Sequence, residues 1–135
     1  MKIISGAERA TRRGNPDWFT GGVWQDPVID TPDPARARAA RVSFEPGART
    51  AWHTHPLGQT LHVLHGTGRV QSWGGPVQVI RAGDTVWIPP DEKHWHGASP
   101  EHGMVHLAIH EHRDNVHVVW LEHVTDEQYN AKVGG

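Results

Sequence analysis

The chain has 135 residues, twelve histidines, no cysteine and a formal net charge of −2. This length suits one ordinary domain that buries roughly two-thirds of its extended-chain surface, so we expect a single domain over 1–135 with its core at about 17–129. The charge supplies no basic field for nucleic acid, and without cysteine a metal site would need nitrogen and oxygen ligands.

The predicted elements are short strands separated by turns. They are rich in Val, Ile, Trp and Thr and recur at a spacing of about 8–12 residues, which is typical of an all-β sandwich or barrel. Ten prolines and fifteen glycines mark the turns. After an N-terminal arm, the predicted strands are 41–47, 60–66, 68–73, 77–83, 84–90, 104–110 and 115–124.

One short helix is expected near the C-terminus. In "VTDEQYN", Thr125 is followed three residues later by Gln128, which is the spacing of a capping box. The sequence therefore predicts a turn or two of helix there, on an otherwise all-β chain.

Pairs of histidines two residues apart occur at three places. They are His53 with His55, His94 with His96, and His110 with His112. In a strand, residues i and i+2 project to the same face, and Gln59 shares this parity if the strand resumes after the turn at 56–58. A chain so rich in histidine contains such pairs by accident, so a single pair does not identify metal ligands.

Two longer blocks have a spacing that is harder to produce by accident. The first block has Gly47, His53, His55, Gln59 and Gly66, and the second has Gly83, Pro89 and His94. These blocks resemble the two motifs of the cupin family, and the resemblance covers nearly all of the chain. It implies a single-domain cupin, a jelly-roll β-barrel with one divalent metal inside. By position in the motifs, the metal ligands are His53, His55, Gln59 and His94.

The blocks depart from the usual cupin pattern in two ways. Gln59 replaces the usual glutamate, and Asp91 and Ala98 stand where glycine and asparagine are usual, which affects a turn and removes no ligand. Three neutral imidazoles and an amide would leave the charge of a divalent ion uncompensated, which favours Lewis-acid chemistry. The alternative is that Gln59 is a hydrogen-bonding core residue and that water completes the coordination.

Candidate proton carriers lie close to these ligands in the sequence. His96 shares the parity of His94, and in 104–110 the face with His106 and His110 alternates with a wholly aliphatic face. Parity alone does not decide which face is interior; the cupin register favours the histidine face. Imidazoles with an ordinary pKa of about 6.5 would suit acid–base work there. The remaining histidines are expected at the surface or rim: His62, His65, His102, His112, His117 and His123.

A finer resemblance is carried by "DWFTGGVWQDP", "FEPGARTAWHTHPLGQTLHV", "EKHWHGA" and "HVTDEQY", from Asp17 to Tyr129. These stretches resemble the small bacterial, manganese-dependent, (R)-selective hydroxynitrile lyases of cupin type, whose metal sits on three histidines and a glutamine. Such enzymes cleave cyanohydrins, for example mandelonitrile to benzaldehyde and hydrogen cyanide, and catalyse the reverse addition. The resemblance implies a Mn²⁺ cofactor, with Fe²⁺ or another first-row metal as the alternative, and His96 and His106 as acid–base residues. The implied substrate pocket is Ala40, Val42, Phe44, Thr50, Leu61, Ala108 and His110.

Other functions and the expected partners follow from the same features. The barrel also suits a metal-dependent dioxygenase that cleaves C–C bonds, or a ligand-sensing cupin without enzymatic activity.

The aliphatic stripe Val105, Leu107 and Ile109, with the apolar run 118–121, predicts a homodimer or homotetramer. No apolar run approaches the ~20 residues of a membrane span, and the N-terminus lacks the apolar region of a signal peptide. We therefore expect a cytoplasmic enzyme with a small-molecule substrate. Neither a membrane nor a nucleic-acid partner is expected.

Overall fold

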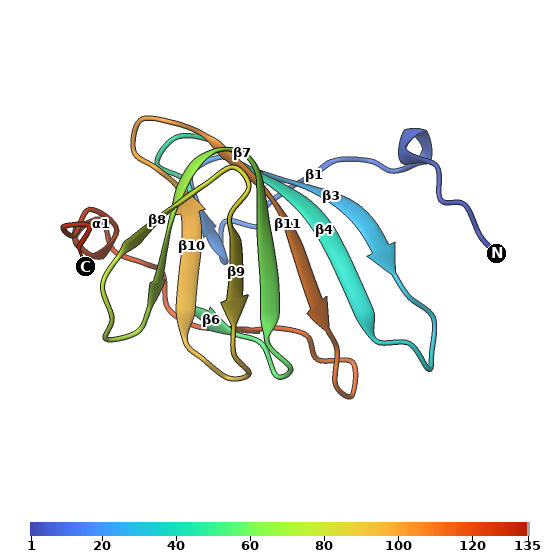
Figure 1. Ribbon diagram of the computed structural model, residues 1–135. Helices are drawn as coiled ribbons and strands as arrows, with labels where there is room; N and C mark the ends of the chain where they lie inside the picture. Colours follow the sequence, from blue (N-terminus) through green and yellow to red (C-terminus); the bar gives the residue numbers. More distant parts are fainter. Residues whose placement is uncertain (135) are drawn as a thin grey trace.

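Strands dominate the computed structural model, which describes residues 1–134 (Figure 1). The strands are β1 (Arg12–Arg13), β2 (Phe19–Thr20), β3 (Val23–Asp30), β4 (Ala37–Phe44), β5 (Arg49–Thr50), β6 (His53–Thr54), β7 (Gln59–Ser72), β8 (Gln78–Arg81), β9 (Thr85–Ile88), β10 (His94–Ala98), β11 (Met104–Glu111) and β12 (Val119–Trp120). The helices are the 3₁₀ turn η1 (Gly6–Glu8) and α1 (Asp126–Tyr129). This composition confirms the predicted all-β class with one short C-terminal helix.

The strands form one hydrogen-bonded sheet that curls into a half-barrel (Figure 1). Its order is β1-β3-β4-β11-β7-β10-β5-β2; β8 and β9 pair with β7, and β6 pairs with β10 and β12. Every pairing between these strands is antiparallel. The curl brings the inner faces of distant strands toward one another, so side chains from many parts of the sequence share one interior.

The long strand β7 makes this curl. The sequence predicts two strands, 60–66 and 68–73, but they are continuous: the first half of β7 pairs with β11 and β9, and the second half pairs with β10 and β8. Between the halves, Gly66 has φ +78°, and a Cβ on Gly68 would lie 2.4 Å from the Gly97 carbonyl oxygen. Only glycine fits these two positions, which let one strand belong to both halves of the sheet.

The structure contains strands that the sequence does not predict, and one predicted strand is shorter than expected. No strand is predicted over 23–30; β3 nevertheless forms there, with a register shift between Pro27 and Ile29. It lies near an edge of the sheet, where a proline and a bulge are tolerated. Conversely, only Val119–Trp120 of the predicted strand 115–124 is a strand, because the segment before it turns back on itself between Arg113 and Val116.

The interior is formed by alternate residues of the strands. In β11, Met104, His106 and Ala108 are buried, whereas Ile109 on the opposite face is 38% exposed. The histidine face is therefore the inner one, as the cupin register favours. The main apolar cluster comprises Phe19, Val23, Val42, Phe44, Ala48, Leu61, Val63, Ile80, Ile88, Ala98, Met104 and Ala108.

The two ends of the chain lie on opposite sides of the sheet (Figure 1). The N-terminal segment, drawn in dark blue, runs away from the strands as the predicted arm. At the other end, the capping box of Thr125 and Gln128 is present as predicted, and the buried Tyr129 donates a hydrogen bond to the Ala98 carbonyl. Neither helix in residues 1–134 is long and apolar enough to cross a membrane.

Candidate metal centre and active site

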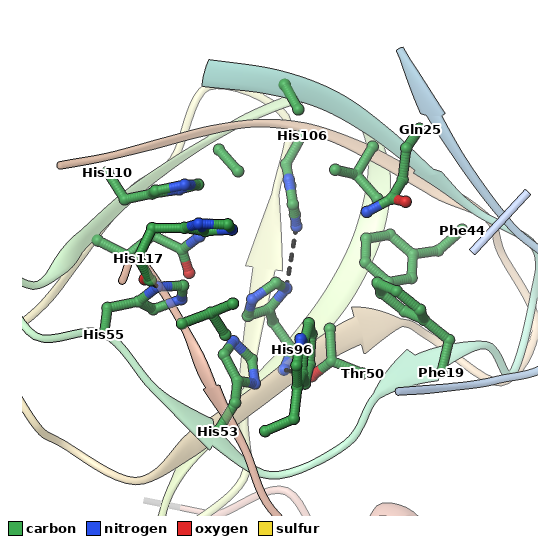
Figure 2. A pocket seen from close by; sticks show the side chains of 16 residues that line it. Phe19, Gln25, Phe44, Thr50, His53, His55, His96, His106, His110 and His117 are labelled. Atoms are coloured by element: carbon green, nitrogen blue, oxygen red, sulfur yellow. Dashed lines mark hydrogen bonds between the residues drawn. The ribbon is translucent and has the colours of Figure 1, made fainter. Parts of the chain in front are cut away.

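The half-barrel holds a cavity of about 100 Å³ that opens to solvent (Figure 2). Its lining residues are Phe19, Gln25, Ala40, Val42, Phe44, Thr50, His53, His55, Gln59, His96, His106, Ala108, His110, His117, Val118 and Trp120. The lining that the structure describes thus has no Asp, Glu, Lys or Arg, and its polar groups are imidazoles, amides and one hydroxyl.

The cavity brings together most of the residues that the sequence analysis assigns to the substrate pocket. Those present are Ala40, Val42, Phe44, Thr50, Ala108 and His110. Leu61 lies elsewhere: it is fully buried in the apolar cluster and is not among the lining residues. Its side chain shares the inner face of β7 with Gln59, but neighbouring core residues cover it.

Five lining residues were not predicted: Phe19, Gln25, His117, Val118 and Trp120. A sequence signal existed for some of them. Trp120 and Val118 have the same parity in the apolar run 118–121, and Val119 between them is 47% exposed. The sequence contains no signal for Gln25, because its pairing with Val42 is known only from the assembled sheet.

Three of the four predicted ligands are imidazoles whose orientation is set by the backbone. His53 Nδ1 lies 2.8 Å from the Ala51 carbonyl oxygen, His55 Nδ1 lies 2.5 Å from that of His117, and His94 Nδ1 lies 2.8 Å from that of Glu92. A carbonyl only accepts, so each Nδ1 carries the hydrogen and each Nε2 keeps its lone pair. Metal-binding histidines are commonly held in this way.

The three imidazole rings cluster, and Gln59 lines the same cavity as His53 and His55. His53 pairs with His94 across β6 and β10, with ring centroids 4.1 Å apart, and the His55 ring lies 5.0 Å from His53 and 5.6 Å from His94. His55 Nε2, His94 Nε2 and Gln59 Oε1 are all buried without a hydrogen-bond partner in residues 1–134. Buried polar atoms are normally paired, so these donor atoms fit a divalent metal ion.

A second set of nitrogen donors overlaps the first. In the described chain, the ring nitrogens that lie within 4.8 Å of one another are those of His53, His94 and His96, and His55 is not in this group; the trio could hold a metal. His96 differs from the other two because its Nδ1 lies 3.0 Å from His106 Nε2 instead of a backbone carbonyl (Figure 2, dashed line). Its Nε2 is buried and has no hydrogen-bond partner in the described chain.

Burial keeps these imidazoles neutral. It lowers the pKa of His94 and of His106 to about 4 and holds the pKa of His53 and His96 well below the ordinary value, because a charged ring would lose its hydration. For His53 and His96 the neighbouring imidazoles lower the pKa further. The expected ordinary pKa of about 6.5 for the acid–base residues is therefore wrong.

A second row of imidazoles extends from His55 toward the solvent. The His110 ring stacks on His55 at 5.3 Å and on His117 at 4.8 Å, and His117 Nδ1 lies 3.0 Å from Arg38 Nη1. Burial, together with the neighbouring imidazoles and Arg38, lowers the pKa of His110 to about 3. His117 is thus at the cavity rim, whereas His112, expected at the surface or rim, is buried at 8% exposure.

An aromatic wall stands opposite this row. Trp120 packs on His53 at 4.7 Å and on Phe19 at 5.5 Å, and Trp18 stacks on the outer side of Trp120 at 5.4 Å. Phe44 lies 5.2 Å from His106. The cavity therefore has a polar side of imidazoles and an apolar side of aromatic rings, with the His96–His106 pair between them (Figure 2).

Comparisons with known proteins agree with this fold. The family model for the cupin domain matches residues 40–120. An (R)-mandelonitrile lyase from Granulicella tundricola is 57% identical over 129 residues, covering 96% of this chain and 98% of that protein.

Solved structures give the same result for the fold. A cupin-like protein from Thermotoga maritima superimposes with a TM-score of 0.86 at 40% identity, covering 95% of this chain and 96% of that one. The polyketide cyclase RemF from Streptomyces resistomycificus gives a TM-score of 0.72 at 22% identity, covering 96% and 90%. With the cupin-domain model matched over more than half of its length, this chain belongs to the cupin family.

Proposed function

We propose that this chain is a metal-dependent hydroxynitrile lyase, which cleaves aromatic cyanohydrins such as mandelonitrile to an aldehyde and hydrogen cyanide and catalyses the reverse addition. The observation that carries the proposal is the cluster of carbonyl-anchored imidazoles beside a buried His96–His106 pair, in a cavity that Gln59 also lines. The 57% identity to an (R)-mandelonitrile lyase supports it.

The proposed ligands are His53, His55, Gln59 and His94, holding Mn²⁺ or another first-row divalent ion. The backbone anchoring of the three histidines favours this set over the trio that includes His96, whose Nδ1 is engaged by His106. When bound, such an ion supplies Lewis acidity that lowers the pKa of a cyanohydrin hydroxyl. With four neutral ligands, the protein adds no negative charge that would oppose this effect.

His96 is the proposed base. If its Nδ1–H donates to His106 Nε2, its Nε2 presents a lone pair to the cavity and accepts the hydroxyl proton. The C–CN bond then breaks, its electron pair leaves with cyanide, and the Nε2 proton is returned to cyanide to give hydrogen cyanide. The proton balance closes within the site. In the synthetic direction, neutral His96 takes the proton from hydrogen cyanide.

His106 positions His96 and stabilises its charge. A neutral His106 accepting from His96 Nδ1–H becomes a stronger partner once His96 is protonated, because charge-assisted hydrogen bonds are stronger. Burial keeps both rings neutral at rest, so the base is available at neutral pH.

The lyase activity is tested by measuring cyanide release from mandelonitrile with Mn²⁺-loaded protein and with the same protein after chelation. We expect release that depends on the metal. A fully loaded protein that releases no cyanide from any aromatic cyanohydrin refutes the proposal. Metal-dependent consumption of dioxygen with an electron-rich substrate would instead identify a dioxygenase, and elemental analysis of the purified protein tests Mn against Fe.

We also propose that two copies pair through the outer face of the sheet. Register places Trp87, Thr60, Ile109, Ala39 and Ile29 in one row across β9, β7, β11, β4 and β3. Residues in one row share a face. Trp87 is 58% exposed and Ile109 38% exposed. The neighbouring row contains Arg41 opposite Asp26, so the face carries both charges and can match a rotated copy of itself.

A cytoplasmic location stays a prediction from the sequence. Cell fractionation of the native host, followed by an activity or antibody assay of each fraction, tests it.

A further inference from the structure

Gln25 stands out among the polar side chains of the cavity. It lies in β3 and pairs with Val42 of β4, whose side chain is buried, so both side chains face the interior. Figure 2 shows the Gln25 amide directed into the cavity beside Phe44.

The hydroxyl and the other amide of the cavity already have a partner or a proposed role. Thr50 Oγ1 accepts the backbone N–H of His96 at 3.2 Å, and Gln59 belongs to the proposed ligand set. The Gln25 side chain, in contrast, is half-buried, and its amide makes no side-chain hydrogen bond within residues 1–134. A polar group in a largely apolar region loses free energy unless a ligand or water satisfies it.

Gln25 also lies away from the proposed ligands. In Figure 2, His55, His110 and His117 occupy one side of the cavity and Phe19, Phe44 and Gln25 the other, with His96 and His106 between them. A substrate whose reacting carbon lay at His96 and whose ring packed on the two phenylalanines would point the far end of that ring toward the side of the cavity that holds Gln25.

We infer that Gln25 determines specificity for aryl aldehydes and cyanohydrins that carry a hydrogen-bonding group, such as a hydroxyl, on the ring remote from the reacting carbon. The inference rests on the proposed lyase function and names its substrate class. A phenol both donates and accepts, which matches the amide NH₂ and C=O of glutamine. Phe19 and Phe44 supply the apolar contacts for the ring itself.

The test measures binding, so it does not depend on turnover. Mn²⁺-loaded wild-type protein is titrated calorimetrically with benzaldehyde, 3-hydroxybenzaldehyde and 4-hydroxybenzaldehyde. We expect at least one hydroxylated aldehyde to bind about 3–10-fold more tightly than benzaldehyde, the gain typical of one neutral hydrogen bond. Gln25→Leu should remove this preference and leave benzaldehyde affinity within about twofold.

Two further variants make the test specific. Gln78→Leu changes an exposed glutamine of β8 and should keep the preference. Gln25→Met keeps an unbranched side chain, and it replaces Gln25→Leu if circular dichroism shows that the leucine variant is unfolded. In turnover assays, loss of the amide should raise KM for 4-hydroxymandelonitrile and leave kcat unchanged.

Equal binding of all three aldehydes by the wild type, or a preference that persists without the Gln25 amide, overturns the inference. A preference that depends on Gln25 in a protein that releases no cyanide keeps the inference on recognition and refutes the lyase function. The failures of the two proposals are therefore distinguishable.

Discussion

At the scale of the residue, the site is organised by what each imidazole does with its second nitrogen. Where Nδ1 meets a backbone carbonyl, as in His53, His55 and His94, the ring is fixed and Nε2 is free to bind an ion. Where Nδ1 meets another imidazole, as in His96, the ring can exchange a proton with its surroundings. Histidines that look alike in the sequence thus acquire different chemistry.

The first prediction concerns the ligands. His55→Ala and Gln59→Ala should each reduce bound metal well below one ion per chain, because each removes one of four donors, whereas His96→Ala should retain it. Elemental analysis after dialysis measures this. The reverse pattern, with metal lost from His96→Ala and kept in His55→Ala, would show that the trio of His53, His94 and His96 holds the ion.

The second prediction concerns the proton. His96→Ala should lose at least about two orders of magnitude in cyanohydrin cleavage, within the ~10²–10⁴ expected for one acid–base residue. His123→Ala, at an exposed position, is the matched control and should lose little. Rates are measured at full metal occupancy, and a His96→Ala rate equal to wild type would remove this residue from the mechanism.

At the scale of the element, β7 shows how a strand serves two halves of a sheet. Glycines at its bend let β10 and β11 approach, which brings His94 and His96 of one strand toward His106 of the other. The bend therefore affects the site as well as the core.

The third prediction tests this bend. A Cβ at Gly68 would lie 2.2 Å from Met104 Sδ and 2.4 Å from the Gly97 carbonyl oxygen, and the latter cannot move without disturbing the sheet. Gly68→Ala should lower the free energy of unfolding by about 1–3 kcal/mol. Gly6→Ala, where a Cβ meets nothing within 4 Å, should change it by less than about 0.5 kcal/mol. Urea denaturation of both variants measures the difference.

At the scale of the whole molecule, the sheet separates two environments. Its inner face holds the cavity, and its outer face carries the row of Trp87, Thr60, Ile109, Ala39 and Ile29. The proposed substrate site and the proposed pairing surface therefore lie on opposite faces of the same sheet.

The fourth prediction concerns assembly. Wild-type protein should have at least the mass of a dimer by light scattering at micromolar concentration, and Ile109→Lys should shift it toward the monomer by placing an unpaired charge in the interface. Val116→Lys changes an exposed apolar residue outside this face and outside the run 118–121, and it should leave the mass unchanged. A monomeric wild type contradicts the proposed pairing.

The fifth prediction concerns acid stability in metal-free protein. The pKa of His106 is lowered by burial to about 4 in the folded chain, so between pH 6.5 and about 4 the unfolded chain binds a proton that the folded chain does not. Stability is therefore full above pH 6.5 and falls as the pH is lowered to about 4, by up to about 3 kcal/mol for this residue. Chelated wild type and His106→Gln are compared by denaturation across this range, and equal slopes would contradict the prediction.

The sequence by itself determined the local features of this protein. Alternation in 104–110, the capping box of Thr125 and Gln128 and the spacing of the two histidine blocks are periodic or short-range patterns, and they are readable from the chain alone. The all-β class and the cupin family follow from them.

Only the tertiary structure decided which side chains meet. The closeness of His96 to His106, the covering of Leu61 and the entry of Gln25 and Trp120 into the cavity depend on strand register and on the bend of β7. The lowered pKa of the interior histidines is likewise invisible in the sequence, because it arises from loss of water around rings that distant strands enclose. Long-range pairing sets these properties, and a local pattern carries no record of its partner.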